Sequence, residues 1–265
     1  MTVLDVTQQG HIVTLTINRP DMRNALGEPG DGQAFSDTIA AINADRNVRC
    51  VILTGAGSAF SAGGNIKAMQ KRDGAFSGAG AHIADGYRRG IHQIVKSLWG
   101  LEVPAIAAVN GPAIGLGNDV ACLCDMRIAA QSAIFGATFL KIGLIPGDGG
   151  AWLLPRIIGA ARAAELLFTG NTISAEEAAR WGLVSQVVSD DKLLETAHAM
   201  ANDIVRQSAE SLRAAKRLMR HGQTSGFETI MEMSANAQAL MHLSEDHVEA
   251  VSAMLEKRPA EYKDE

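Results

Sequence analysis

The amino-acid sequence predicts an α/β core followed by a helical C-terminal section. Short apolar runs alternate with helical patterns as far as residue 188, which is typical of α/β proteins. From Leu193 onward the pattern is helical almost without a break and is rich in Ala, Leu, Met and Glu. We therefore divide the chain into a core, residues 1–195, and a helical section, residues 196–265.

The first elements alternate between strand and helix. Residues 11–17 alternate apolar and polar β-branched side chains, which predicts a strand with one face on the core, and Pro20 follows it. Residues 33–44 carry apolar side chains at helical spacing. Residues 48–54 form a continuous apolar run, which predicts a strand buried on both faces.

The middle of the chain continues this alternation. A helix begins near Asn65 and gives way to the glycine-rich residues 73–80, which predict a mobile loop. Residues 83–98 have one apolar stripe and predict a single helix. The remaining core elements are a strand at 104–109, a short helix at 117–123 and short strands at 126–129 and 133–136.

Composition and charge exclude several function classes. Lys plus Arg number 24 against 29 for Asp plus Glu, and no basic block is present to neutralise a phosphate backbone. The longest apolar stretches, such as 103–109, are far shorter than the roughly 20 residues that cross a bilayer. Residues 1–10 also lack the features of a signal peptide. We therefore expect a cytoplasmic protein with neither a nucleic-acid nor a membrane partner.

The cysteines and histidines do not predict a metal site. Cys50, Cys122 and Cys124 form no CxxC pair, which favours buried thiols in a reducing compartment. His242 and His247 are five residues apart, a spacing that puts them on different faces of one helix. We expect a solvated helix face there.

Two glycine-rich segments suggest where the chemistry occurs. Glycine makes up 27 of the 265 residues, and it recurs at 60–67 (Phe-Ser-Ala-Gly-Gly-Asn-Ile-Lys) and 110–117 (Asn-Gly-Pro-Ala-Ile-Gly-Leu-Gly). Each segment follows a buried strand and precedes a helix, where unblocked backbone N–H groups attract an anion. One such segment could be an ordinary strand-to-helix turn. Two that face a single point form an oxyanion hole.

Several motifs together resemble the enoyl-CoA hydratase/isomerase (crotonase) superfamily. They stand in the family's order and approximate spacing over nearly the whole chain. The matching segments are 19–26, 60–67, 109–128, 143–150, 165–184 and 256–259.

The resemblance implies a fold, a ligand and an assembly. The fold would be a spiral of repeated ββα units with a helical C-terminal section that packs against neighbouring subunits. The assembly would be a trimer or a dimer of trimers. The substrate would be an acyl-CoA thioester of the kind handled in fatty acid metabolism, and no separate cofactor is expected because CoA is part of the substrate.

The same resemblance implies the binding residues. The two oxyanion donors fall on the backbone N–H groups of Gly64 and Leu116. Lys257 would approach the CoA phosphates, from a neighbouring subunit or its own. The remaining positions expected at the CoA site are Arg23, Ala25, Ala62, Asn65 and Ile66.

The catalytic carboxyls depart from the family's pattern. Family hydratases usually have two glutamates, and these positions correspond here to Asp119 and Phe139. Phenylalanine cannot transfer a proton, so Asp148 in the following glycine-rich loop is a second candidate. The alternatives are a helix N-cap for Asp119 and a turn residue for Asp148. Asn65 also stands where the family often has Asp.

The function expected from these residues is hydration of a 2-enoyl-CoA. The oxyanion hole would stabilise a thioester enolate while carboxyls at Asp119 and Asp148 position water and carry protons. One alternative is an isomerase or a thioester or C–C hydrolase on the same fold. Another is an inactive CoA-binding protein, which Phe139 would permit. His92 and Glu102 could reach the pocket, although a helix face is the favoured interpretation for both.

Overall fold

A six-stranded sheet forms the centre of the protein. The computed structural model describes residues 2–263. The strand order is β1-β2-β3-β4-β6-β9; β1 and β2 are antiparallel and every other pair is parallel. The strands are β1 Leu4–Gln9, β2 Ile12–Ile17, β3 Cys50–Gly55, β4 Ala105–Val109, β6 Met126–Ala130 and β9 Gln186–Val188.

A second, three-stranded sheet has the order β5-β7-β8. Its strands are short: β5 Ala113–Ile114, β7 Ile134–Gly136 and β8 Thr172–Ser174. An isolated bridge between Ser61 and Ala113 links the first strand of this sheet to the loop after β3. The small sheet therefore joins the two glycine-rich segments.

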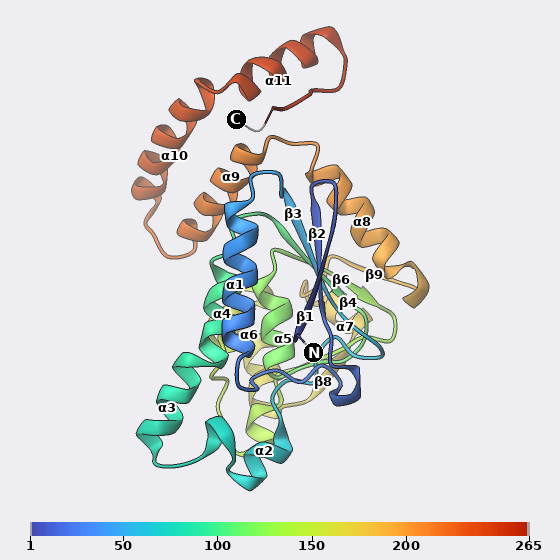
Figure 1. Ribbon diagram of the computed structural model, residues 1–265, viewed down its shortest axis with the longest axis vertical. Helices are drawn as coiled ribbons and strands as arrows, with labels where there is room; N and C mark the ends of the chain where they lie inside the picture. Colours follow the sequence, from blue (N-terminus) through green and yellow to red (C-terminus); the bar gives the residue numbers. More distant parts are fainter. Residues whose placement is uncertain (1, 264–265) are drawn as a thin grey trace.

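Helices cover both faces of the large sheet (Figure 1). Helices α1 and α4 lie on one side with α5 and α6, and α8 packs on the other side against β3, β4 and β6. Every residue of β3 is buried, as the apolar run at 48–54 predicts. The helices are α1 Asp31–Ala44, α2 Ile66–Lys71, α3 Gly80–Arg89, α4 Ile91–Trp99, α5 Leu116–Leu123, α6 Gly150–Thr169, α7 Ala175–Arg180, α8 Leu193–Ile204, α9 Ala209–Gly222, α10 Phe227–His242 and α11 Glu245–Glu256.

The predicted α/β class with a helical C-terminal section is confirmed. Two details of the prediction are wrong. Residues 83–98 are not one helix, because Gly90 adopts φ −111° and ψ −94° and separates α3 from α4. His242 and His247 do not share a helix either; α10 ends at His242 and α11 begins at Glu245, so the two ring nitrogens lie 3.1 Å apart across the turn.

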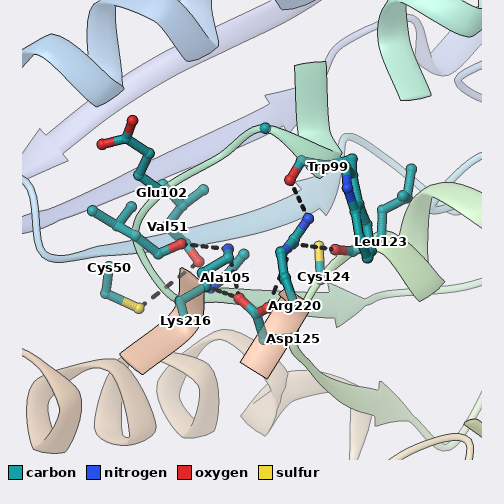
Figure 2. A network of polar contacts seen from close by, with 12 residues as sticks. Cys50, Val51, Trp99, Glu102, Ala105, Leu123, Cys124, Asp125, Lys216 and Arg220 are labelled. Carbon is teal, nitrogen blue, oxygen red and sulfur yellow. Dashed lines mark hydrogen bonds and ion pairs between the residues drawn. The ribbon is translucent and has the colours of Figure 1, made fainter. Parts of the chain in front are cut away.

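Charged side chains of α9 attach the C-terminal section to the core (Figure 2). Lys216 Nζ lies 2.7 Å from Asp125 Oδ2 and donates a hydrogen bond of 2.6 Å to the carbonyl of Val103. Arg220 lies 3.5 Å from the other Asp125 oxygen and donates to the carbonyl of Trp99. Asp125 also accepts the backbone N–H of Ala105 at 2.8 Å, which ties α9 to the start of β4.

Helices α10 and α11 extend beyond the end of the large sheet, at the opposite end of the longest axis from α2 (Figure 1). None of the residues of α10 is buried. No helix among residues 2–263 is both long and apolar enough to cross a membrane.

Candidate active site

The loop after β3 is held by one buried amide. Asn24 is fully buried and lies in the left-handed region with φ 57°. Its Nδ2 donates to the carbonyls of Ala56 and Ala59 at 2.8 and 2.7 Å, while its Oδ1 accepts the N–H of Arg19 at 2.9 Å. A buried side chain with all of these bonds made fixes the loop against the segment before α1.

Two glycines allow the backbones of the two glycine-rich segments to lie in direct contact. A Cβ on Gly63 would lie 2.5 Å from the carbonyl oxygen of Ile114, and one on Gly117 would lie 2.2 Å from that of Ser61. The segments are joined by a hydrogen bond of 3.0 Å from Ile114 N–H to Ser61 O. Any larger residue would force the segments apart, so glycine is required by close approach.

This contact brings the two expected oxyanion donors to one cavity. Gly64 and Leu116 both line a cavity of about 60 Å³. Leu116 is the first residue of α5, where backbone N–H groups have no partner within the helix. Among residues 2–263, no acceptor is recorded for the N–H of Gly64 or of Leu116. Both N–H groups therefore retain the capacity to bind an oxygen of a ligand.

The remaining walls of the cavity are largely apolar. Phe139, at the usual position of the family's second glutamate, is one of them and is nearly buried. This position therefore supplies shape and water exclusion rather than a proton. The other apolar residues of the wall are Ala62, Ile66, Met69, Ile91, Ile114, Leu116, Ile142 and Leu144.

Asp148 is the carboxylic acid that lines the cavity. Its side chain is 5% exposed, and no hydrogen bond to its carboxylate is recorded within the described part of the chain. Burial raises the pKa of Asp148 to about 6, and the charge of His92 partly opposes that shift. An acid with a pKa in this range can accept and return a proton near neutral pH.

Asp119 lies behind the cavity wall rather than in it. It is fully buried, accepts the backbone N–H of Gly150 at 2.9 Å and lies 3.3 Å from the amide nitrogen of Asn118. Burial, followed by the charge of Asp148, raises the pKa of Asp119 to about 8. The N-cap of α5 is Gly115, so the N-cap interpretation of Asp119 is wrong.

Two aromatic side chains lie near Asp148: Tyr87, which the sequence analysis did not single out, and His92, for which it favoured a helix face. Tyr87 lines the cavity, and its ring packs edge-on against the ring of His92 at 5.9 Å between centroids. His92 Nε2 lies 2.9 Å from the carbonyl oxygen of Gly147, the residue before Asp148. The periodicity of residues 83–98 showed only an apolar stripe, so it gave no signal for these contacts.

The other expected binding residues lie in different places. Ala62 and Ile66 line the cavity, whereas Arg23 and Ala25 lie in the segment before α1. The N–H of Ala62 donates to the carbonyl of Arg23 at 2.9 Å, which connects that segment to the cavity.

Asn65 caps the short helix beside the cavity. Its side chain accepts the N–H of Ala68 at 3.2 Å, and its amide donates to Glu28 at 2.7 Å. Lys257 is exposed at the end of α11, far along the molecule from α2 (Figure 1), so the chain does not bring it to its own cavity.

A larger cavity of about 640 Å³ lies between α4, α6 and α9. It is lined by Trp99, Trp152 and the cationic face of α9, but by none of Gly64, Leu116 and Asp148. The smaller cavity is the candidate active site, because the two expected oxyanion donors and Asp148 all line it.

The fold is that of crotonase-like enzymes. The crystal structure of an enoyl-CoA hydratase from Bacillus anthracis matches with a TM-score of 0.92 and 34% sequence identity, covering 99% of this chain and 100% of that one. A family model described as "Enoyl-CoA hydratase/isomerase" matches residues 7–265. The chain belongs to the enoyl-CoA hydratase/isomerase family, which confirms the expected class of enzyme.

Relatives with different reactions are similarly close in sequence. A 1,2-epoxyphenylacetyl-CoA isomerase of Escherichia coli (strain K12) is 36% identical over 98% of this chain and 97% of its own length. A crotonyl-CoA hydratase of Syntrophomonas wolfei is 35% identical over 95% and 94%. Sequence identity alone therefore does not separate hydration from isomerisation, and the site geometry must decide.

Proposed function

We propose that the protein is an enoyl-CoA hydratase, which adds water to the double bond of a 2-enoyl-CoA. The observation that carries this proposal is the meeting of two backbone N–H groups and one carboxylic acid in a single apolar cavity. The family membership and the names of several relatives support the same reaction.

In this proposal the thioester carbonyl oxygen lies between the N–H groups of Gly64 and Leu116. When water attacks the β-carbon, the electrons of the double bond move toward the carbonyl oxygen and form an enolate. Fixed N–H donors stabilise that charge, each contributing about 10²–10³ in rate. The apolar walls exclude bulk water and strengthen the effect.

Asp148 then transfers the proton. Its carboxylate accepts a proton from the attacking water as the new C–O bond forms, and it returns that proton to the α-carbon as the enolate collapses. One carboxyl is sufficient for this cycle because the same proton is taken and returned. A pKa of about 6 leaves Asp148 largely ionised at pH 7, as the first step requires.

Asp119 has a supporting part in this scheme. Its bond to the N–H of Gly150 holds the loop that carries Asp148. A pKa of about 8 keeps the Asp119 carboxyl largely protonated at pH 7, so that it adds little repulsion to Asp148.

The CoA portion is proposed to bind along Arg23, Ala25, Ala62, Asn65 and Ile66, with no cofactor besides the substrate itself. Ala62 and Ile66 line the cavity, and Ile66 is 59% exposed and therefore open to a ligand. The hydrogen bond from the N–H of Ala62 to the carbonyl of Arg23 places Arg23 next to this wall. Lys257 would reach the CoA phosphates of a neighbouring subunit, since it directly follows α11, and α11 lies at the opposite end of the molecule from α2 beside the cavity (Figure 1).

We also propose a homo-oligomer, a trimer or a dimer of trimers, acting in the cytoplasm. Large apolar side chains of α10 and α11 are exposed, with Met254 81%, Leu255 79% and Phe227 75% exposed. Such surfaces mark contacts with another protein. Three free, buried cysteines support a reducing compartment.

The test is a mass-spectrometric assay with crotonyl-CoA and a panel of branched and aromatic enoyl-CoAs. Wild type is expected to give a product heavier by one water, and Asp148→Asn is expected to form that product about 10³-fold more slowly. Asp119→Asn is expected to retain product formation, because an amide oxygen can still accept the Gly150 N–H. Binding without any change of mass would contradict the hydratase proposal.

A second candidate is isomerisation of a 3-enoyl-CoA to its 2-enoyl isomer. It is favoured by the observation that Asp148 is the one carboxyl lining the cavity among residues 2–263, because a 1,3-proton shift needs a single base. The product has the same mass as the substrate, so it is detected by the absorbance of the conjugated thioester.

A further inference from the structure

We propose that His92 is a positioning residue for Asp148: its Nε2–H holds the loop that carries the carboxylate, and its imidazole is a neighbouring group that can carry a positive charge. This inference rests on the proposed function, in which Asp148 transfers the proton. No motif of the sequence points to His92, which lies in α4 outside both glycine-rich segments.

The loop around Asp148 has little restraint of its own. Asp148 is flanked by Gly147 and Gly149, and Gly149 adopts φ 109°. Glycine has the widest conformational freedom of any residue, so two of them beside a catalytic carboxylate leave its direction weakly defined. The hydrogen bond of 2.9 Å between His92 Nε2 and the carbonyl of Gly147 supplies a restraint from another element.

The His92 ring is itself held by aromatic neighbours. Tyr87 packs against it edge-on, with 66° between the ring planes, and Phe76 packs against Tyr87 at 6.3 Å. In an unbroken helix, residues five apart would point in different directions. The break at Gly90 between α3 and α4 turns Tyr87 and His92 toward each other. The departure from the predicted single helix therefore creates this support.

The bond to Gly147 survives a change of charge on His92. A carbonyl oxygen only accepts hydrogen bonds, so Nε2 must carry a proton in the neutral ring, and it does so in the imidazolium as well. The imidazole can therefore become a cation beside Asp148 without releasing the loop.

His92 is the group that favours the ionised form of Asp148. Three titratable groups face this carboxylate: Tyr87 from α3, His92 from α4 and Asp119 from α5. The first and last are neutral or negative, and the charge of Asp148 raises the pKa of both. His92 alone among the three can carry a positive charge, and it opposes the rise in the pKa of Asp148 that burial causes.

The experiment separates the hydrogen bond from the charge. His92→Gln keeps an N–H donor without a titratable ring, and His92→Leu removes both. His82→Leu is the matched control, because His82 is an exposed imidazole of α3 that does not line the cavity. The readouts are kcat and kcat/KM against pH and the ¹³C titration of the Asp148 carboxyl, assigned with Asp148→Asn.

For His92→Leu we expect kcat to fall about 10–100-fold. We also expect the acidic limb of the kcat/KM profile and the Asp148 titration to move up by about one pH unit. His92→Gln should recover most of kcat while keeping the shift. His82→Leu should leave both readouts unchanged. If His92→Leu fails to fold, as judged by circular dichroism, the Gln variant carries the test through the shift alone.

The outcomes distinguish a failure of the role proposed for His92 from a failure of the proposed hydratase function. Wild-type kcat with an unmoved Asp148 titration in both His92 variants would overturn the role of His92, even where Asp148→Asn is inactive and the proposed function stands. Conversely, a wild type that converts no enoyl-CoA would overturn the proposed function. The Asp148 titration in the His92 variants would still decide the placement of His92.

Discussion

Two aspartates show how differently this protein treats an acidic side chain. Asp125 lies between β4 and α9 and is fully partnered by Lys216, Arg220 and a backbone N–H (Figure 2). Asp148 faces a cavity, and no hydrogen bond to its carboxylate is recorded among residues 2–263. The first arrangement suits a scaffold, and the second suits a group that must exchange a proton.

The energetics follow from this difference. A buried charge is tolerated when opposite charges and hydrogen bonds replace its lost water, and removing one partner then leaves the other uncompensated. A buried carboxylate without such partners is held at a cost in stability, and strained or unpaired groups gather at functional sites. Asp125 should therefore matter for folding, and Asp148 for chemistry.

The largest effect is expected for Asp148→Asn, which should lower kcat about 10³-fold. The same variant should be more stable than wild type at pH 8. The pKa of Asp148 in the folded protein, about 6, lies above its ordinary 3.8, so the folded state loses stability as pH rises through this interval. An amide carries no such charge, and we expect a gain of about 1–2 kcal/mol. Urea unfolding beside the activity assay measures both.

A loss of stability in Asp148→Asn would contradict the proposed difference between Asp148 and Asp125. It would show that the Asp148 carboxylate also stabilises the fold. The comparison should be made at pH 8, where the Asp148 side chain of the wild type is ionised.

Lys216→Met should have the opposite profile. Lys216 is 5% exposed, and its loss leaves Asp125 with the longer contact to Arg220 as its remaining ion pair, beside the N–H of Ala105. We expect the free energy of unfolding to fall by about 3 kcal/mol, with kcat per folded molecule unchanged. Lys96→Met is the control, because Lys96 is an exposed lysine on α4. A fall in kcat without a fall in stability would place Lys216 in the active site instead.

Asp119 gives a third, pH-dependent test. Its pKa of about 8 in the folded protein lies far above the ordinary 3.8, so the folded state binds a proton that the unfolded state releases. Stability from this group is therefore present at low pH and is lost as pH rises toward and through 8. Asp119→Asn should flatten that dependence.

We expect the difference between wild type and Asp119→Asn to change by about 2 kcal/mol from pH 6 to pH 9. Urea midpoints for both proteins at these pH values measure it. If the stability of both proteins changed equally with pH, Asp119 would already be ionised in the folded state. Its charge would then repel the carboxylate of Asp148.

The sequence was sufficient for the fold class and for the glycine-rich segments. Apolar runs and glycine positions are local signals, and the contacts of Gly63 and Gly117 are their direct consequence. The resemblance also led to Asp148, which lines the cavity. The depth of Asp119 could not be read from the sequence, because it depends on how α6 begins against α5.

The position of His92 was even less predictable from the sequence than the depth of Asp119. Its place beside Asp148 requires the break at Gly90 and the packing of α4 against the loop at residues 145–149. A single glycine inside an apolar stripe does not predict that the helix ends there, since helices tolerate single glycines at a cost of about 1 kcal/mol. Long-range packing, rather than local propensity, determines this part of the site.

The smallest effect is expected at the edge of the cavity, for Asn65→Asp. The new carboxylate can still accept the N–H of Ala68 as a helix N-cap, but it loses the amide that donates to Glu28 at 2.7 Å. Two carboxylates would then face each other, so we expect a loss of about 1 kcal/mol at pH 8 that disappears as pH falls and one of them protonates. Activity should stay within a factor of about two, because a backbone N–H at Gly64 is unaffected by the side chain that follows it. Chemical unfolding at pH 5 and pH 8, with kcat at both, measures these effects. A large loss of kcat would show that the side chain of Asn65 takes part in the chemistry together with Asp148, beyond lying along the CoA portion.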